Sequence, residues 1–203
     1  MVKIQVNKLH TLTGHNDCIY ALAEAPDPRY FFTGSGDGMV VLWDLEDPKD
    51  GKLIAKVNHS VYALEVDRNR NQLIIGHNFE GIHVIDLMDQ KELWSLNITN
   101  QSIFDIKVAG NNIFVGTGDG MFIQTRAVKK HLKISEKSVR VLAINPAGTK
   151  IAAGLSDHSI KVFDLNSLEP IHNLSSHTNS VFALAFDPNN SILISGGRDA
   201  SLK

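Results

Sequence analysis

The chain has 203 residues, of which 43% are hydrophobic, so it can bury a sizeable core as one large domain or two small ones. Its 20 Lys and Arg residues against 22 Asp and Glu residues give a net charge of -2, and no nucleic-acid partner is expected because there is no overall attraction to a polyanion. The single cysteine, Cys18, excludes an internal disulfide, and no apolar run approaches the roughly eighteen residues of a membrane helix. These features predict a soluble protein with a cytoplasmic location and no membrane partner.

Helical periodicity is almost absent along the chain. Apolar residues instead form short runs rich in Val, Ile and Phe and broken by Gly, Asn, Asp and Pro, which predicts consecutive strands. Short connections predict antiparallel hairpins, with Asp37-Gly38 and Asp119-Gly120 as tight-turn signals. In chain order, the predicted strands are Ile4–Leu12, Ile19–Ala23, Tyr30–Thr33, Met39–Leu45, Leu53–Val57, Val61–Val66, Gln72–Ile75, Ile82–Leu87, Glu92–Ile98, Ile103–Val108, Asn112–Gly116, Met121–Thr125, His131–Ile134, Val139–Ile144, Lys150–Ala153, Ser159–Leu165, Pro170–Leu174, Val181–Phe186 and Ile192–Ser195.

An internal repeat organises these strands. The first strands of successive units match at Ile19, Val61, Ile103, Val139 and Val181, with spacings of 42, 42, 36 and 42 residues. The ends of the third strands match independently at Asp44, Asp86, Arg126 and Asp164. A small sheet with two apolar faces cannot bury either face alone, so repeated sheets must stack on one another. The sequence therefore predicts an all-β array of small sheets.

The pairs Gly14-His15 and Trp43-Asp44 resemble the WD40 repeat family of β-propellers, whose blades carry these pairs at about this period. The resemblance implies an all-β fold of four-stranded antiparallel blades, with about five blades present of an expected seven. The chain is interpreted as one domain, residues 1–203, incomplete at its C-terminus, and a five-bladed ring is the alternative. The segment Ile4–Leu12 is expected to complete the last blade. The repeat units are placed at about 12–45, 57–87, 98–126, 134–165 and 174–203.

In this family a hydrogen-bonded network holds each blade together. The resemblance implies that His15, Thr33, Asp37 and Trp43 form it in the first unit, and that His177, Ser195 and Asp199 match it in the last. The middle units depart from the pattern and are expected to be softer. The second keeps His59 but has Ile75, Phe79 and Ile85 at the other places. The third keeps only Asp119, with Val115, Thr125 and Arg126 elsewhere, and the fourth keeps Asp157 and has Phe163-Asp164 in place of Trp-Asp.

Other chemical interpretations of these motifs are weaker. The segments Gly34–Gly38 and Gly116–Gly120 could suggest phosphate loops, but a strand, not a helix, follows each, which favours tight turns. His15, His59 and His177 are interpreted as recurring at one repeat position, which favours a structural role over metal binding. The turn aspartates also recur, whereas a catalytic residue should be singular. No catalytic residue, metal or cofactor is therefore predicted.

Polar and aromatic residues that differ between units are better functional candidates. The residue after each first-strand anchor is expected near the central channel on the narrower top face of a propeller, as the resemblance implies. Together with residues before the turn aspartates, these give a predicted partner-binding set of Tyr20, Tyr62, Phe104, Arg140, Phe182, Arg198 and Asn78. Tyr and Arg are enriched in interface hot spots. The alternative is that the aromatic side chains only pack between blades.

The preferred interpretation is a non-catalytic scaffold that binds a protein or peptide at this face. The two arginines predict a partner segment with a carboxylate or phosphate group. The first alternative is an enzyme or small-molecule binder that uses the central channel, and the second is a scaffold segment without a dominant site. Exposed terminal blades would also make self-association a risk.

Overall fold

The computed structural model describes residues 5–124, 128–175, 177–189 and 192–203. Within these ranges the regular elements are strands, and neighbours in a sheet are antiparallel. The first sheet has the order β1-β2-β3-β4, with β1 (Ile19–Glu24), β2 (Tyr30–Ser35), β3 (Met39–Asp44) and β4 (Lys52–Lys56). The second sheet repeats that order with β5 (Val61–Asp67), β6 (Gln72–His77), β7 (Gly81–Asp86) and β8 (Lys91–Leu96).

The remaining sheets follow the same plan. The third contains β9 (Ile103–Ala109), β10 (Asn112–Thr117), β11 (Met121–Gln124) and β12 (Lys129–Leu132). The fourth contains β13 (Val139–Ile144), β14 (Lys150–Leu155), β15 (Ile160–Asp164) and β16 (Pro170–Leu174). The last is two-stranded, with β17 (Val181–Phe186) and β18 (Leu193–Gly197), and Leu202 adds an isolated bridge to Gly196.

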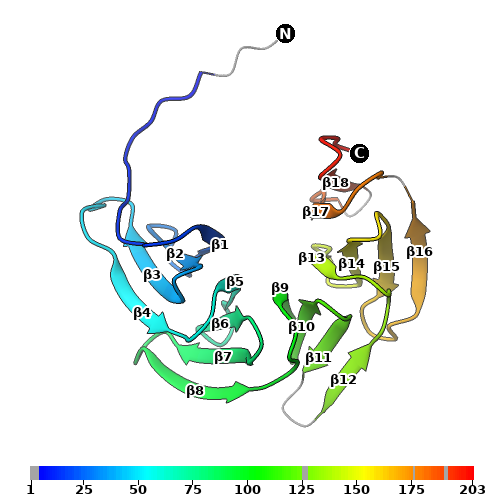
Figure 1. Ribbon diagram of the computed structural model, residues 1–203, viewed down its shortest axis with the longest axis horizontal. Coiled ribbons are helices and arrows are strands. Elements are labelled where there is room, and N and C mark those ends of the chain that lie inside the picture. Colours follow the sequence, from blue (N-terminus) through cyan, green and yellow to red (C-terminus); the bar gives the residue numbers. More distant parts are fainter. Residues whose placement is uncertain (1–4, 125–127, 176, 190–191) are drawn as a thin grey trace.

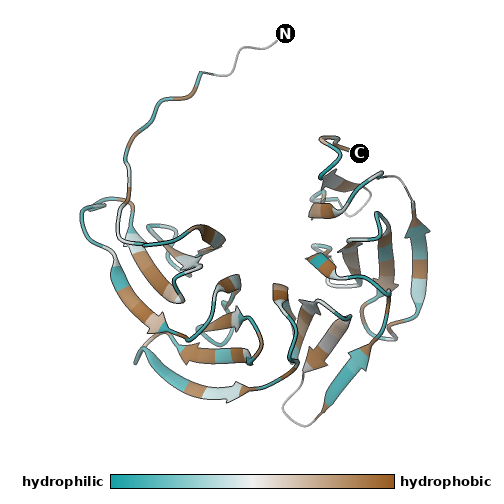
Figure 2. Ribbon diagram, viewed as in Figure 1, coloured by the Kyte–Doolittle hydropathy of each residue, from teal (hydrophilic) through white to brown (hydrophobic). Residues whose placement is uncertain are grey.

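The five sheets stand around a common centre in an open arc (Figure 1). Strands β1, β5, β9, β13 and β17 line its inner side, and β4, β8, β12 and β16 lie at the outer rim. This arrangement confirms the predicted fold class, an all-β propeller of WD40 type with four-stranded antiparallel blades. Figure 2 shows hydrophobic residues concentrated on the inner strands and hydrophilic residues along much of β12.

The core lies between neighbouring sheets, as expected for sheets that are apolar on both faces. The repeat anchors Val61, Ile103, Val139 and Val181 each have 0% exposure. Each anchor packs against a glycine of the preceding sheet: a Cβ added at Gly34, for example, would lie 2.5 Å from Val61 Cγ1. The close approach of successive sheets therefore requires glycine at this position.

The N-terminal segment does not form the strand that the sequence predicts. The strand predicted at Ile4–Leu12 is wrong for the described residues 5–12, which form no strand, and Val6 and Leu9 are 84% and 83% exposed. The described part of this segment extends away from the first sheet, and the two-stranded last sheet with β18 lies across the opening of the arc (Figure 1). Thr125 and Arg126 lie outside the described residues, and the repeat-unit boundaries stay predictions.

Candidate partner-binding face

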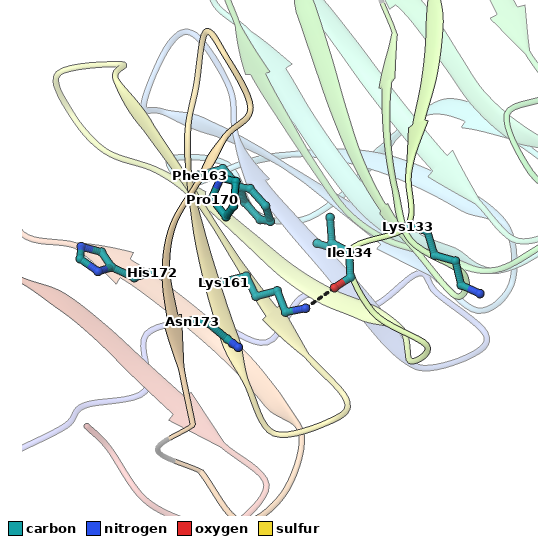
Figure 3. Close-up of a pocket in the computed structure, with 7 residues that line it drawn as sticks. All are labelled: Lys133, Ile134, Lys161, Phe163, Pro170, His172 and Asn173. Atoms are coloured by element: carbon teal, nitrogen blue, oxygen red, sulfur yellow. Dashed lines mark hydrogen bonds between the residues drawn. The ribbon is translucent and has the colours of Figure 1, made fainter.

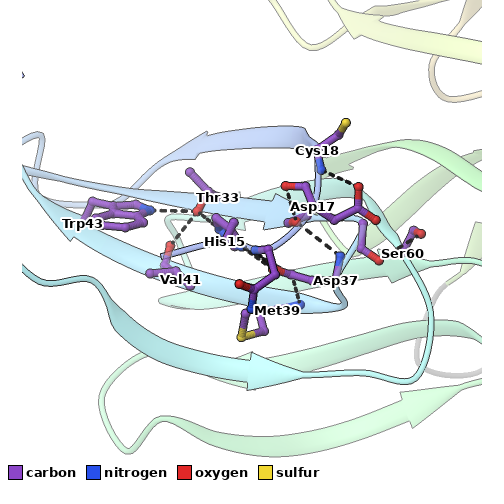
Figure 4. Close-up of polar contacts among 12 residues, drawn as sticks. His15, Asp17, Cys18, Thr33, Asp37, Met39, Val41, Trp43 and Ser60 are labelled. Atoms are coloured by element: carbon purple, nitrogen blue, oxygen red, sulfur yellow. Dashed lines mark hydrogen bonds and ion pairs between the residues drawn. The ribbon is translucent and has the colours of Figure 1, made fainter. Parts of the chain in front are cut away.

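A chain of hydrogen bonds ties together the four residues named for the first blade (Figure 4). Trp43 Nε1 donates to Thr33 Oγ1 at 2.8 Å, and Thr33 Oγ1 lies 2.7 Å from His15 Nε2. His15 Nδ1 lies 3.2 Å from Asp37 Oδ2, which also accepts the Asn16 N–H at 2.8 Å. These backbone and side-chain donors hold the pKa of Asp37 below its usual range, against the opposing effect of burial. The carboxylate thus fixes both the loop before β1 and the turn between β2 and β3.

Two residues that sequence reasoning missed play the same part in other blades. Ser135 Oγ donates to Asp157 Oδ2 at 2.6 Å, and Thr99 Oγ1 lies 3.5 Å from Asp119 Oδ1. Each of these hydroxyls stands four residues before its first-strand anchor, as His15 does before Ile19. In the last sheet, His177 Nδ1 lies 3.0 Å from Asp199 and His177 Nε2 lies 2.8 Å from Ser195 Oγ. The fixed offset of four residues was the signal that could have found them.

His59 does not occupy this position, so its assignment to the same place as His15 and His177 is wrong. It stands two residues before the anchor Val61, not four, and Val57 takes the place of His15. The His59 side chain is 42% exposed, and its nearest charged partner is Glu80, at 3.7 Å. The second blade therefore holds its turn without the histidine–aspartate contact, because Phe79 replaces the aspartate.

The predicted aromatic residues lie in a continuous row across four inner strands. The ring centroids of Tyr20 and Tyr62 are 4.4 Å apart, and those of Tyr62 and Phe104 are 6.1 Å apart. The guanidinium carbon of Arg140 then lies 4.0 Å from the Phe104 ring centroid. These are the separations of favourable aromatic pairs and of a cation over an aromatic face. We call Tyr20, Tyr62, Phe104 and Arg140 the aromatic row.

Arg140 is held in place while most of its donors stay available. Its Nε donates to Ser156 Oγ at 2.8 Å, and neither Nη1 nor Nη2 makes a hydrogen bond to another described residue. Burial lowers the pKa of Arg140, but an arginine stays charged at neutral pH. Tyr20, at the other end of the row, is 48% exposed, and neighbouring Tyr62 raises its pKa, so its phenol remains a donor. The row therefore offers aromatic surface that ends at an oriented guanidinium.

Among the described residues, no hydrogen bond or ring contact joins the remaining residues of the predicted set to the row. Phe182 is 50% exposed on β17, and the Arg198 side chain is exposed at the turn after β18, where the Arg198 N–H donates to Ser180 O at 2.8 Å. Asn78 is only 8% exposed, and its Oδ1 has no hydrogen-bond partner among the described residues. Asn78 therefore offers a partner almost no surface.

Charged side chains that the sequence did not single out form a cluster on the inner strands. Lys107 Nζ lies 3.1 Å from Glu65 Oε2 and 3.6 Å from Asp105 Oδ1. Asp105 Oδ2 accepts the Leu142 N–H of the next sheet at 2.7 Å. Burial raises the pKa of Asp105 and of Glu65 against the opposing charge of Lys107. Because these groups bond one another, the cluster links sheets more clearly than it offers a ligand site.

A pair of histidines lies in the second blade. His77 Nε2 is 2.8 Å from His83 Nε2, and His83 Nδ1 is 3.1 Å from Glu92 Oε1. The His77 side chain has 0% exposure, and desolvation lowers its pKa to about 4, so it is neutral at pH 7. Among the described residues, no group of three or more His, Cys, Asp or Glu side chains is arranged to hold a metal ion.

A shallow pocket lies at the rim of the fourth blade (Figure 3). Phe163 and Pro170 form its apolar floor, and Lys161 Nζ donates to Ile134 O across it. Lys133 points away from that floor in Figure 3 and pairs with Glu136 at 2.9 Å. The two lysines therefore do not converge on a common ligand position.

Small antiparallel sheets around a centre define a repeat protein of the β-propeller class. In four of the five described sheets a polar side chain before the first strand contacts the turn aspartate, and we call this contact the polar clamp. The family model described as "WD domain, G-beta repeat" matches residues 6–44, 124–164 and 168–203, which is more than half of the chain. The chain belongs to this family, the WD40 repeat proteins.

Curated relatives agree with this assignment. A striatin homolog of Dictyostelium discoideum is 24% identical over 195 residues, covering 94% of this chain and 20% of the relative. The human U5 small nuclear ribonucleoprotein 40 kDa protein is 24% identical over 210 residues, covering 96% of this chain and 58% of the relative. The crystal structure of the computationally designed Ika8 protein matches with a TM-score of 0.76 at 20% identity, covering 94% of this chain and 59% of that one, which shows the fold alone.

These comparisons support a general class of function. WD40 proteins are generally scaffolds for protein interactions and typically not enzymes. The chain spans 20% and 58% of the two relatives, so their whole-protein activities do not transfer directly. Within the described residues, the structure contains no helix of the length and apolarity that a membrane crossing needs.

Proposed function

We propose that this protein is a non-catalytic scaffold that binds a protein or peptide segment on the face formed by the aromatic row. The observation that carries the proposal is the row itself, in which Tyr20, Tyr62 and Phe104 stack in succession and end at Arg140. The position is Tyr in the first two sheets and becomes Phe in the third and Arg in the fourth. An arginine beside aromatic rings supports a binding role more than a role in packing between sheets, because arginine is almost never fully buried without a partner.

The favoured partner segment is acidic or phosphorylated. The unbonded Nη1 and Nη2 of Arg140 present a planar pair of donors that matches a carboxylate or phosphate group. An aromatic or proline side chain beside that group would pack on Tyr62 and Phe104. The exposed Arg198 and Phe182 would extend the contact toward β17.

Fluorescence anisotropy with a labelled peptide library tests this proposal. The library pairs each acidic or phosphorylated peptide with a neutral peptide of the same length. The best acidic binder is expected to lose affinity by about 2 to 4 kcal/mol with the Arg140→Ala, Arg198→Ala double variant, as expected when charge-assisted hydrogen bonds are removed. Arg68→Ala is the matched control, because Arg68 is exposed and pairs with Glu24 on another part of the molecule.

Two results would contradict the proposal. One is equal affinity for the acidic and the neutral peptides of the library. The other is an affinity for the best acidic peptide that does not change in the double arginine variant. The first alternative, an enzyme or small-molecule binder that uses the central channel, predicts a small-molecule shift in melting temperature that depends on Glu65 or Lys107. Crosslinks spread over many faces would indicate a scaffold segment without a dominant site.

A cytoplasmic location is part of the proposal and rests on the single cysteine, which is compatible with a reducing compartment. One relative is named for a small nuclear particle, so fractionation should compare cytoplasm with nucleus. Self-association is proposed as well, because Ile19 and Phe182 are 51% and 50% exposed on the first and last sheets.

A further inference from the structure

The turn between β6 and β7 differs from the corresponding turn of every other described sheet. In those four turns the residue with a positive φ comes directly after the turn aspartate: Gly38, Gly120, His158 and Ala200. In the second sheet a positive φ of 70° falls on Phe79, which takes the place of the aspartate. A side chain of this size is strained in the left-handed region, and such strain persists only where something offsets it. Folding alone would favour glycine or asparagine at this position.

The strained turn holds the phenyl ring of Phe79 partly in solvent. The residue is 51% exposed, and its ring centroid lies 5.5 Å from that of His59, with the two rings nearly perpendicular at 89°. Core clusters join the second sheet to the first and to the third, so no missing neighbour explains this exposure. The side chain therefore adds little to the core, and an aromatic surface for a ligand explains its position better.

A carboxylate lies beside this ring. Glu80 is the next residue, its side chain is 45% exposed, and its Oε1 lies 3.7 Å from Nε2 of the same His59. Its Oε2 lies 4.0 Å from His77 Nδ1, but His77 is neutral at pH 7 because desolvation lowers its pKa to about 4. Both distances exceed a hydrogen bond, and the Glu80 carboxylate accepts none from another described residue. An aromatic ring next to a carboxylate attracts the ammonium of lysine or the guanidinium of arginine.

The turn lies at the same end of the sheets as the aromatic row. The Phe79 N–H donates to Gln101 O at 3.3 Å, and Gln101 lies three residues before Phe104. His59, which neighbours both residues of the turn, lies three residues before Tyr62. The turn is thus beside the middle of the row, away from the arginine at its end.

We propose that Phe79 and Glu80 form a subsite for a lysine or arginine of the partner segment whose acidic group binds Arg140. The subsite rests on the proposed function and narrows it, because the segment then carries two opposite charges, separated by the stretch that crosses Tyr62 and Phe104. The two charges fix the direction in which the segment binds. A reversed segment would place its basic residue against Arg140, where like charges repel.

A lysine scan of the bound peptide tests the subsite. The best acidic peptide of the library is remade with lysine at each position in turn, and a paired peptide carries glutamine there. Fluorescence anisotropy should show one position, or two neighbouring ones, at which lysine binds about three to ten times more tightly than glutamine. The gain should disappear with Glu80→Gln. Asp89→Asn is the matched control and should keep the gain, because Asp89 is exposed at the opposite end of β7.

Phe79→Asn separates binding from folding. Asparagine tolerates a positive φ, so this variant relieves the strain, and its melting temperature is expected to rise. Its affinity for the lysine peptide should fall to that for the glutamine peptide, because the aromatic surface is lost. A lower melting temperature together with an unchanged affinity would show that Phe79 serves the fold, and would overturn the subsite.

The subsite and the proposed function fail in different ways. An acidic peptide whose affinity depends on Arg140, but which gains nothing from lysine at any position, would overturn the subsite alone. The same holds for a lysine gain that Glu80→Gln leaves intact. A library without a binder that depends on Arg140 would overturn both proposals.

Discussion

Thr33 is the residue at which the polar contacts of the first blade meet. Its hydroxyl accepts from Trp43 Nε1 and lies 2.7 Å from His15 Nε2, and Thr33 is only 2% exposed. The His15 tautomer with its proton on Nδ1 fits these contacts: Trp43 donates to Thr33, Thr33 donates to His15, and His15 Nδ1 donates to Asp37. The Thr33 hydroxyl is therefore the shared partner of Trp43 Nε1 and His15 Nε2.

Thr33→Val is therefore expected to destabilise the protein by about 3 kcal/mol. The change keeps the volume but leaves Trp43 Nε1 and His15 Nε2 buried without a partner, and each such group costs on the order of 1–3 kcal/mol. Urea unfolding followed by tryptophan fluorescence measures the loss. Thr178→Val serves as a control, because Thr178 is exposed and uses only its backbone N–H in the equivalent contact of the last sheet. Equal effects of the two substitutions would contradict a special role for the Thr33 hydroxyl.

For single residues, the sequence predicted which side chains form the network of the first blade. It did not predict that a different side chain can make the same contact in another blade. His15, Thr33, Asp37 and Trp43 were found because they match a family pattern letter by letter. Ser135 and Thr99 were missed because a hydroxyl does the work of an imidazole, and the turn aspartate requires only a donor at the right offset. His59 was misassigned because its identity was weighed above its offset from Val61.

Asp105 makes a polar contact between the third and fourth sheets. Its Oδ2 accepts the Leu142 N–H at 2.7 Å, close to the irregularity between Val139 and Val141 in the pairing of β13 with β14. Asp105→Ala is expected to destabilise the protein by about 3 kcal/mol, because it leaves that N–H unpaired and removes one of two partners of Lys107. Asp105→Asn keeps an acceptor and should cost less. Thermal unfolding of the two variants measures the difference, and equal melting temperatures would contradict the role of the acceptor.

His77 makes the second blade sensitive to acid. Its pKa is lowered from 6.5 to about 4 by desolvation and by the nearby His83 and His59, with Glu80 opposing. The unfolded chain thus binds more protons between these two values, so the stability of the folded state falls as pH drops from about 6.5 toward 4. The full loss is about 3 kcal/mol, which is the free energy of the pKa difference.

His77→Thr isolates this effect, because Thr117 occupies the same register position in the third blade. The difference in unfolding free energy between the variant and the unmodified chain should shift in favour of the variant below pH 6.5. Taking this difference removes the contribution of carboxylates, such as Asp44, whose pKa Arg29 lowers to about 2. His10→Thr, in an exposed segment, is the control, and a difference that does not change with pH would contradict the prediction.

The strands were predicted more accurately than the contacts of single residues. The anchors Val61, Ile103, Val139 and Val181 each begin an inner strand, because a β-branched residue there must pack on a glycine of the preceding sheet. The contact between Asp105 and Leu142 could not be predicted, since it joins residues 37 positions apart across two sheets. The predicted strand at Ile4–Leu12 failed for its described residues because a short apolar run forms no strand unless a neighbouring strand pairs with it.

At the scale of the whole molecule, burial is uneven around the arc. The residues Leu73, Ile74 and Ile75 of β6 are 0–1% exposed because sheets cover both sides of the second blade. On β17 and β18, Phe182 and Ile194 are about half exposed. This distribution differs from the expectation that the middle blades are softer through their missing polar clamps, and it makes the last sheet the better candidate for local opening.

Hydrogen exchange at low protein concentration distinguishes these two expectations. Amides of β17 and β18 should exchange faster than those of β6 and β14, because local opening there exposes little additional apolar surface. Fastest exchange in β6 would instead show that the missing clamp outweighs burial in setting local stability.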